Sequence, residues 1–559
     1  MEIRKTLLVA FIISGAASLI YEITWIRPLQ FLLGSTTYVL SIIFGAFMAG
    51  LALGAFVISK HADIIKNLPR TYALLEIGIG LYGVLLLSIF NFLPKIYNLL
   101  YSMHSVFYLF QIVQFLLVFL VLLIPTTLMG ATFPIIVKFY TKEKIGKSIG
   151  EIYSANTLGA IIGSFSAGFI LIPLIGIKAS IITAGTLNLI IGAYILIEDR
   201  EFNKFFLVFF MLLFLMLALI GNYSIQRMHS GGFYRTSPEI ETMGDVVYYE
   251  EGLYATVTVR EFPVRGYALF INGKGQGSYA IKDLRVNHLL SYIPPLIKPS
   301  LGDALVVGLG TGTTSGHLAQ LANVTTVELE PKILGVIPYF SIFNLDVLKN
   351  PSHELIMGDG RNYLLKNKEK YDIIVQEPSD PWQSFSSSLY SKEFMEIVKE
   401  DLSEDGLFVK WVPIYTMSVE DFRNFYKTFN EVFPNNVAFA NIKSDEPGIP
   451  AQFATSEIIL VGSKKEIIIN EESIITNYDL LPEISRQYLE AINLGSGNEI
   501  YHLLLFTNEQ MSGYADDAKF ITDDKPILEF SSARTVFASK PQDVLEDINK
   551  FLEKEENAF

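Results

Sequence analysis

The chain has 559 residues, too many for a single hydrophobic core, so at least two domains are expected. A net charge of -14 without a basic stripe argues against binding to nucleic acid, and the absence of cysteine excludes disulfides and thiolate chemistry. Hydrophobic residues make up 51% of the sequence and are concentrated before about residue 223, whereas the later part has the composition of a soluble protein.

The first part of the chain, residues 1–224, is predicted to be a multi-pass α-helical bundle in a cell membrane. Small residues recur at four-residue spacing, as at Gly50 and Gly54 or Gly159 and Gly163, and such pairs let helices pack closely within lipid. Hydrophobic stretches long enough to cross a bilayer lie near 7–33, 37–59, 72–94, 105–126, 152–174, 178–197 and 203–222. Seven spans are therefore expected.

Ionisable residues and prolines inside these stretches are candidates for function, because charges are costly in lipid. Glu22 and Arg27 are interpreted either as an ion pair or interfacial anchor, or as part of a substrate or proton pathway. Glu76 is a third ionisable residue of this kind. Pro125 and Pro134 indicate either a broken helix that lines a cavity or a simple bend.

The distribution of Lys and Arg predicts that the N-terminus is cytoplasmic. The loops on one side of the seven predicted spans carry eleven such residues and the loops on the other side carry three. An odd number of spans would place the soluble part on the far side of the membrane. An eighth or re-entrant span within 105–140 would reverse this placement, so the side of the soluble part stays open.

Residues 225–300 are predicted to form a small β-strand subdomain. The stretches YYEEGLYATVTVREF and YALFINGKGQGSY have the pattern of short strands, and Asn272 with Gly273 is a hairpin turn signal. From residue 301 to 559 apolar strands alternate with helical stretches, which predicts a mostly parallel sheet covered by helices on both faces. Ligands of such sheets bind at the carboxyl ends of the strands.

Candidate nucleoside-binding residues follow three successive predicted strands. Gly308, Gly310 and Gly312 permit a tight turn and a close approach of the backbone to a ligand, although a plain turn between strand and helix has the same pattern. Glu328 ends the next strand, where a carboxylate can accept hydrogen bonds from both hydroxyls of a ribose, and Asp359 follows the third and could hold an adenine amino group. No phosphate-binding lysine motif is present, so a nucleoside fits better than a nucleotide.

Two carboxylates follow the fourth strand, in the stretch VQEPSDPW. Glu377 and Asp380 together can neutralise a cationic amine, and one of them can accept a proton as the nitrogen attacks an electrophilic carbon. The alternative interpretation is that Ser379 and Asp380 only form a turn and cap a helix. The seven histidines are scattered without metal-ligand spacing, and no metal is expected.

Together these residues resemble the spermidine synthase family of aminopropyltransferases, specifically its membrane-fused group, over about 245–535. SGAASLIYEITWIR and ANTLGAIIGSFSAG in the first part, and LYSKEF and TDDKPILEF in the second, also fit that group. The resemblance implies a β-strand subdomain followed by a Rossmann-like, class I methyltransferase-like domain. It places Gln276 near the thioether of the donor and matches His288 to a family histidine, while the three glycines, Glu328 and Asp359 fall on nucleoside-binding positions.

The sequence also departs from the family pattern, mainly where the family binds amines. The glycine-loop aspartate is replaced by Thr311, and the residues that flank the family histidine are Asn287 and Leu289. Glu377 falls on the proton-accepting aspartate. At the following strand end a glutamine and a glutamate are replaced by Trp411 and Pro413. Several contacts to a polycation are therefore absent, and the binding fold matches the family better than the polyamine site does.

The resemblance implies transfer of an aminopropyl group from decarboxylated S-adenosylmethionine, or of another group from S-adenosylmethionine itself, to a small amine or polyamine. Glu377 is expected to take the proton, and the acceptor is expected to contact Tyr254, Asp380, Trp382 and Tyr415. Two alternatives stay open, namely a non-catalytic binding domain that regulates a transporter or sensor and a methyltransferase. The oligomeric state is also open, a homo-oligomer included.

Overall fold

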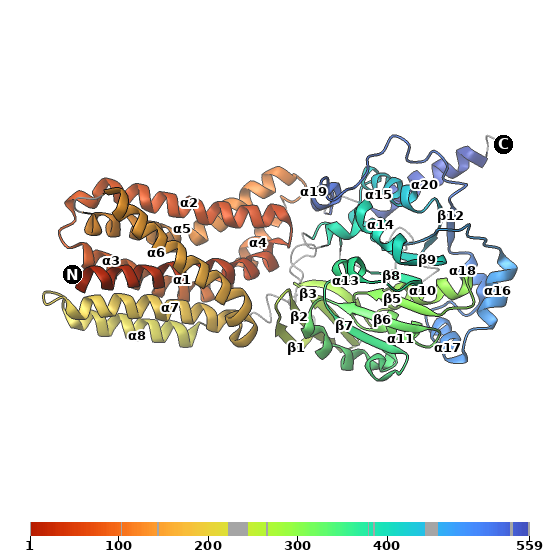
Figure 1. Ribbon diagram of the computed structural model, residues 1–559, viewed down its shortest axis with the longest axis horizontal. Coiled ribbons are helices and arrows are strands. Elements are labelled where there is room, and N and C mark those ends of the chain that lie inside the picture. Colours follow the sequence, from red (N-terminus) through yellow and green to blue (C-terminus); the bar gives the residue numbers. More distant parts are fainter. Residues whose placement is uncertain are drawn as a thin grey trace. The chain divides into compact units, whose positions relative to one another are not determined.

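The computed structural model describes residues 2–101, 103–141, 145–221, 244–263, 266–377, 380–383, 386–441, 457–536 and 540–556. These residues form two compact units (Figure 1). The helical unit contains the described residues up to 221 together with Glu251–Thr256, and the α/β unit contains the other described residues from 244 onward. Each unit is described by itself below.

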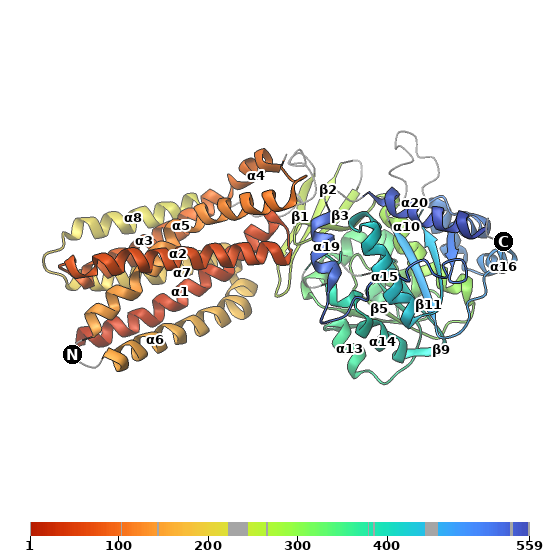
Figure 2. The same ribbon diagram turned by 90° about the horizontal axis from the view of Figure 1, so that it is seen from above.

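The helical unit is a bundle of long helices that run beside one another (Figure 2). Its helices are α1 (Glu2–Leu33), α2 (Thr37–His61), α3 (Leu68–Phe90), α4 (Leu93–Tyr101), α5 (Phe107–Tyr140), α6 (Ile145–Ser166), α7 (Ile172–Glu198) and α8 (Lys204–Ile220). The most extensive contacts join α2 with α5, α1 with α6, and α3 with α7. Both prolines of α5 lie inside a single assigned helix, so they do not end it.

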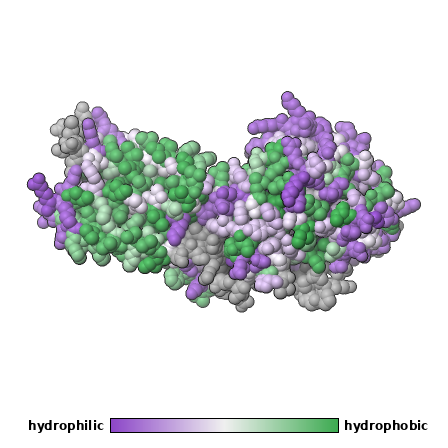
Figure 3. Space-filling view, turned by 90° about the horizontal axis from the view of Figure 1, so that it is seen from below, coloured by the Kyte–Doolittle hydropathy of each residue, from purple (hydrophilic) through white to green (hydrophobic). Residues whose placement is uncertain are grey.

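Five helical stretches among the described residues are long and apolar enough to cross a membrane. They are Lys5–Leu33, Thr37–Ile64, Leu68–Phe90, Phe107–Tyr140 and Ile145–Glu198, and the apolar α8 is shorter. The last stretch is interrupted at Gly176, whose φ of 77° and ψ of 172° are not helical. Figure 3 shows hydrophobic side chains over much of the visible surface of this unit. The number of crossings stays a prediction.

Glycines mark the closest helix contacts of the bundle. A Cβ atom on Gly159 of α6 would lie 1.9 Å from the carbonyl oxygen of Ile12, and one on Gly163 would lie 2.1 Å from that of Ala16. The glycine pair in GLALG meets α5 equally closely. The backbones of these helices therefore touch, as the spacing of small residues predicts.

Two of the ionisable residues in the helical unit have defined partners. Arg27 donates hydrogen bonds to the carbonyl oxygens of Gly252 at 2.9 Å and Leu253 at 3.0 Å, both in the segment that groups with this unit. Glu76 is fully buried, and its Oε2 accepts a hydrogen bond of 2.6 Å from Asn188 of α7. Arg27 thus anchors a loop, and the carboxyl of Glu76 joins α3 to α7.

Replacing Gly159 by alanine is expected to destabilise the bundle, because the added methyl group would force α6 away from α1. Overpacking of this kind costs roughly 1–3 kcal/mol. Gly150→Ala in the same helix is the matched control, since nothing lies within 4 Å of a Cβ there. The thermal unfolding midpoint of the full chain in detergent should fall for Gly159→Ala only; equal midpoints for both variants would contradict the close contact.

The α/β unit begins with a small sheet of four strands, β1 (Asp245–Glu251), β2 (Thr256–Phe262), β3 (Gly266–Ile271) and β4 (Lys274–Ser278). Strands β2, β3 and β4 pair antiparallel. The β3–β4 turn is formed by Asn272 and Gly273, which have φ values of 49° and 78° as a two-residue hairpin requires. Apolar residues of β2 and β3 pack against Leu309 and against apolar residues within 333–347. Both segments connect strands of the large sheet described next.

The large sheet has eight strands in the order β12-β10-β11-β9-β8-β5-β6-β7. Strands β5 to β9 are parallel neighbours, and β11, β10 and β12 extend the sheet antiparallel. The strands are β5 (Asp303–Val307), β6 (Asn323–Glu328), β7 (His353–Met357), β8 (Tyr371–Gln376), β9 (Leu402–Val412), β10 (Asn435–Ala440), β11 (Ile458–Ser463) and β12 (Leu504–Thr507). The chain passes from β5 out to β7 and returns to β8 beside β5, so the sheet reverses its order between β5 and β8.

Helices cover both faces of this sheet, as the alternating pattern predicts. One face is covered by α10 (Ile281–Ile297), α11 (Thr313–Leu318), α16 (Glu471–Asp479), α17 (Glu483–Ala491) and α18 (Gly497–Tyr501). The other is covered by α13 (Gly360–Lys366), α14 (Lys392–Asp401), α15 (Val419–Val432), α19 (Ile527–Thr535) and α20 (Pro541–Glu556). Helix α10 falls within the range expected for the β-strand subdomain, but it packs on the large sheet.

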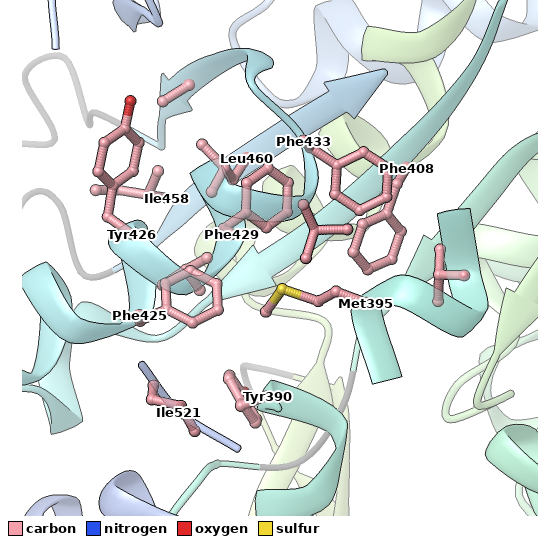
Figure 4. Packing of buried hydrophobic residues seen from close by; sticks show 14 of the residues in the cluster. Tyr390, Met395, Phe408, Phe425, Tyr426, Phe429, Phe433, Ile458, Leu460 and Ile521 are labelled. Carbon is pink, nitrogen blue, oxygen red and sulfur yellow. The ribbon is translucent and has the colours of Figure 1, made fainter. Parts of the chain in front are cut away.

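The core on the second face is rich in aromatic side chains. Figure 4 shows Phe425, Phe429 and Phe433 around α15 facing Phe408 of β9, with Met395 of α14 beside them. All five are fully buried. Helix α15 starts at a capping box in which the side chains of its first residues exchange hydrogen bonds with the backbone. This packing places α14 and α15 against β9.

Candidate active site

The loop that follows β5 is built from glycines in the left-handed region. Gly308, Gly310 and Gly312 have φ values of 97°, 53° and 79°, which side chains rarely adopt. A Cβ atom on Gly312 would also lie 2.9 Å from Val347 Cγ1. The loop leads directly into α11, at the edge where the order of the sheet reverses. This is the position at which doubly wound sheets bind ligands.

The carboxylate of Glu328 ties the end of β6 to this loop. Its Oε2 accepts a hydrogen bond of 2.8 Å from Leu309 N, and its Oε1 accepts one of 2.8 Å from Glu330 N. Burial raises the pKa of Glu328, while the backbone N–H groups oppose that shift. The carboxylate thus draws the backbone at the start of the glycine loop and the backbone after β6 together, and its contact with a ribose stays a prediction.

Asp359 follows β7 at the same edge of the sheet. Its side chain is exposed, and its Oδ1 caps α13 by accepting a hydrogen bond of 2.8 Å from Asn362 N. The preceding residue, Gly358, donates its N–H to the carbonyl oxygen of Glu328 at 2.8 Å. Asp359 therefore lies next to the end of β6, and its contact with adenine stays a prediction.

Strand β4, which carries Gln276, passes the glycine loop at Gly277, and the contact of Gln276 with a donor stays a prediction. A Cβ atom on the neighbouring Gly277 would lie 2.9 Å from Thr311 Cγ2. The hydroxyl of Thr311 is 2.9 Å from that of Thr313 at the start of α11. Thr311, which stands where the family usually has an aspartate, thus contacts both β4 and α11.

His288 lies inside the protein, on the face of α10 that meets α11. Its Nδ1 is 2.6 Å from the carbonyl oxygen of Leu284, and its ring centroid is 4.3 Å from that of His317. Burial lowers the pKa of His288 to about 4, so the ring is neutral near pH 7. His317 also packs in this cluster, within 2.7 Å of the hydroxyl of Tyr292. The structure thus places His288 in a packed aromatic cluster behind the glycine loop.

Glu377 follows β8 and is held from two sides. Asn287 Nδ2 of α10 lies 2.9 Å from its Oε1 and 3.0 Å from its Oε2, and the hydroxyl of Thr314 donates to Oε2 at 3.3 Å. Burial raises the pKa of Glu377 to about 7, although the bonds from Thr314 and Asn287 act in the opposite direction. A carboxylate with this pKa can accept a proton near neutral pH.

Asp380 is fully buried beside Tyr415 and Lys274. The hydroxyl of Tyr415 donates to its Oδ1 at 2.7 Å, and Lys274 Nζ of β4 lies 2.7 Å from its Oδ2. Lys274 Nζ also lies 5.7 Å from the ring centroid of Trp411. Trp382, two residues after Asp380, is 3% exposed. Asp380 and Tyr415, both predicted to contact the acceptor amine, are therefore in contact with each other. The carboxylate of Asp380 is already paired with the ammonium group of Lys274.

One predicted acceptor residue belongs to the other unit. Tyr254 lies in the segment Glu251–Thr256 that groups with the helical unit, and its side chain is half-exposed. It is not among the residues that the α/β unit brings together. Its role in binding an acceptor stays a prediction.

Several site residues were not assigned a role from the sequence. Asn287 was noted only as a departure from the family, yet it holds Glu377; Thr314 and Lys274 lie directly beside recognised motifs. On the other face of the sheet the fully buried Lys410 donates to Gln376 Oε1 at 2.5 Å, and burial lowers its pKa. The sequence signal for this buried lysine is its place within the apolar stretch LFVKWV.

The order of the strands and the helices on both faces define a Rossmann-like class of domain. The family model of the spermine/spermidine synthase domain matches residues 284–444, which include most of α10, the glycine loop and all the strand ends from β5 to β9. Over these residues the chain is therefore similar to the spermine/spermidine synthase domain, and the curated relatives described next are similar over a longer stretch.

The relatives extend over different shares of the chain. Polyamine aminopropyltransferase 2 of Aquifex aeolicus is 24% identical over 421 residues, which cover 73% of this chain and 79% of that protein. The polyamine aminopropyltransferase of Saccharolobus solfataricus is 30% identical over 196 residues, covering 34% of this chain and 64% of that protein. The crystal structure of spermidine synthase from Thermotoga maritima aligns with 19% identity and a TM-score of 0.35, covering 44% of this chain and 88% of that chain.

Replacing Glu328 by glutamine is expected to destabilise the α/β unit. A glutamine has one oxygen, so its amide nitrogen would face a backbone N–H that Glu328 now satisfies, at a cost of roughly 1–3 kcal/mol. Glu354→Gln, on the exposed side of β7, is the control. The thermal unfolding midpoint at pH 8 should fall by a few degrees for Glu328→Gln alone. An unchanged midpoint would mean that the carboxylate does not hold the loop.

Proposed function

We propose that the chain is a membrane-bound aminopropyltransferase that transfers the aminopropyl group of decarboxylated S-adenosylmethionine to an amine. The observation that carries this proposal is the position of Glu377, whose pKa is raised to about 7 and which is bonded to the helix that starts at the glycine loop. The names of the curated relatives support the same activity. No metal is required for this reaction.

In the proposed reaction the lone pair of the acceptor nitrogen attacks the aminopropyl carbon bonded to the sulfonium sulfur. The new C–N bond forms as the C–S bond breaks, and its electrons go to sulfur, which leaves as the neutral thioether of methylthioadenosine. The nitrogen loses a proton to Glu377. The nitrogen must be held in line, about 3–3.5 Å from the carbon, for this displacement.

The donor is proposed to occupy the edge formed by β5, β6 and β7. Its ribose hydroxyls donate to Glu328, its adenine lies at Asp359, and its thioether lies near Gln276. The positive-φ glycines support this arrangement, because a backbone without side chains permits close approach. Asn287 and Thr314 act as positioning residues, because their hydrogen bonds fix the orientation of the Glu377 carboxylate.

We also propose that the helical unit lies in a lipid bilayer as a multi-pass anchor, with its N-terminus in the cytoplasm. Five helical stretches of sufficient length and the excess of Lys and Arg in one set of loops support this proposal. The donor is made in the cytoplasm, so the reaction requires the site to face that side or the donor to cross. A reporter fused after Phe559 shows on which side of the membrane the α/β unit lies.

Replacing Glu377 by glutamine should abolish turnover while leaving donor binding nearly intact, because Gln keeps the shape but cannot accept the proton. Loss of a general base lowers rates by about 10²–10⁴-fold. The purified chain is incubated with decarboxylated S-adenosylmethionine and amines, and methylthioadenosine release is measured, with donor binding followed by calorimetry. Glu396→Gln, on the exposed side of α14, is the control and should be unaffected.

Unchanged turnover in Glu377→Gln would remove this residue from the mechanism. Release of adenosylhomocysteine from intact S-adenosylmethionine would indicate methyl transfer instead. Absence of both products, together with absence of donor binding, would favour a regulatory module without turnover.

The rate of the wild-type chain should rise with pH through a midpoint near 7, because Glu377 accepts a proton only as a carboxylate. Asn287→Leu removes hydrogen bonds that stabilise the carboxylate, so the midpoint should move to higher pH by about one unit. Asn477→Leu, whose amide bonds the carbonyl oxygen of Leu296 away from the site, is the control. The acceptor amine titrates identically in all three proteins, so a midpoint shared by all would exclude control by Glu377.

A further inference from the structure

We propose that Lys274 takes the place of a substrate ammonium at Asp380, so that the site accepts a monoamine with an apolar remainder in preference to a diamine or polyamine. This inference rests on the proposed aminopropyl transfer and specifies its acceptor. It follows from the partners of Asp380, from the charge of Lys274 and from the aromatic residues around the pair.

The carboxylate of Asp380 has no exposed surface, and it accepts a hydrogen bond on one oxygen and forms an ion pair through the other. Tyr415 donates to Oδ1 at 2.7 Å, and Lys274 Nζ is 2.7 Å from Oδ2. The Lys274 side chain is only 15% exposed. Burial of a single carboxylate is costly unless it is paired, and this chain supplies the counter-charge itself.

A second ammonium on the acceptor would meet an unfavourable environment at this position. It would have to displace Lys274, which is attached to the same protein and therefore competes at a high effective concentration. If Lys274 stayed, two ammonium groups would lie side by side near a single carboxylate, and like charges placed together reduce affinity strongly. The acceptor nitrogen that attacks the donor is neutral during the reaction and carries no such penalty.

Aromatic side chains provide the remaining surface near this ion pair. The Trp411 ring lies 5.7 Å from Lys274 Nζ and 6.3 Å from the Tyr415 ring, between centroids. Trp411 is 7% exposed and follows Lys410 at the end of β9. The ammonium near the Trp411 ring is already that of Lys274, so these faces are left to cover the hydrocarbon part of an acceptor.

The test compares butylamine with 1,4-diaminobutane as acceptors in the full chain, with methylthioadenosine release as the readout. The wild type is expected to favour butylamine in kcat/KM by about tenfold or more. Lys274→Gln removes the positive charge but keeps a hydrogen-bond donor for Asp380, and it should raise kcat/KM for 1,4-diaminobutane by at least about tenfold. Lys274→Met should act in the same direction, without the hydrogen bond.

Three further variants isolate the cause. Lys274→Arg retains the charge and should retain the preference for butylamine. The double variant Lys274→Gln with Asp380→Asn lacks the carboxylate and should gain no activity with 1,4-diaminobutane. Lys298→Met breaks a similar ion pair, 2.8 Å from Asp372 at the start of β8, and should leave the acceptor preference unchanged.

A wild type that prefers 1,4-diaminobutane, or Lys274 variants with an unaltered preference, would overturn the inference. Absence of turnover with every amine would instead overturn the proposed function. In that case calorimetry with 1,4-diaminobutane still decides the inference: binding by Lys274→Gln but not by the wild type supports it, and equal binding or no binding by both overturns it.

Discussion

The hydrogen bond from the backbone N–H of Leu309 to Glu328 joins the ends of β5 and β6, and the rest of the candidate site depends on the loop that it holds. The same loop contacts β4 through Thr311 and continues into α11, whose Thr314 reaches Glu377. A short segment of seven residues thus connects the proposed donor side to the proposed base. Its glycines supply the backbone conformations that make these contacts compatible.

Two buried ionisable side chains of the α/β unit have partners that define their positions. Asp380 has Lys274, and the buried Lys410 has the side-chain oxygen of Gln376 together with the ring of Tyr390 at 3.9 Å from its Nζ. Gln376 and Glu377 are adjacent in sequence and point to opposite faces of the sheet, because side chains alternate along a strand. The two faces therefore differ in function: one carries the proposed base, and the other carries a packed lysine.

The sequence predicted the large sheet and the positions of its strand ends well. Strands buried on both faces have continuous apolar patterns such as YDIIV, and the glycines and acidic residues that follow them are visible motifs. The turn between β3 and β4 was likewise predicted from two adjacent residues, Asn272 and Gly273. Residues whose roles depend on contacts between distant segments could not be assigned in this way. Asn287 and Lys274 lie about ninety and more than a hundred residues from the carboxylates they contact.

The return of the chain from β7 to β8 beside β5 has a consequence for how this architecture diversifies. Apart from Gln276 of β4, the groups assigned to the donor come from the ends of β5, β6 and β7 on one side of that boundary, whereas Asp380, Tyr415 and Trp411 come from the ends of β8 and β9 on the other. Substitutions in the loops after β8 and β9 therefore change the proposed acceptor contacts without replacing the residues at the ends of β5, β6 and β7. A lineage of such proteins is free to explore new nucleophiles while it keeps a single activated nucleoside.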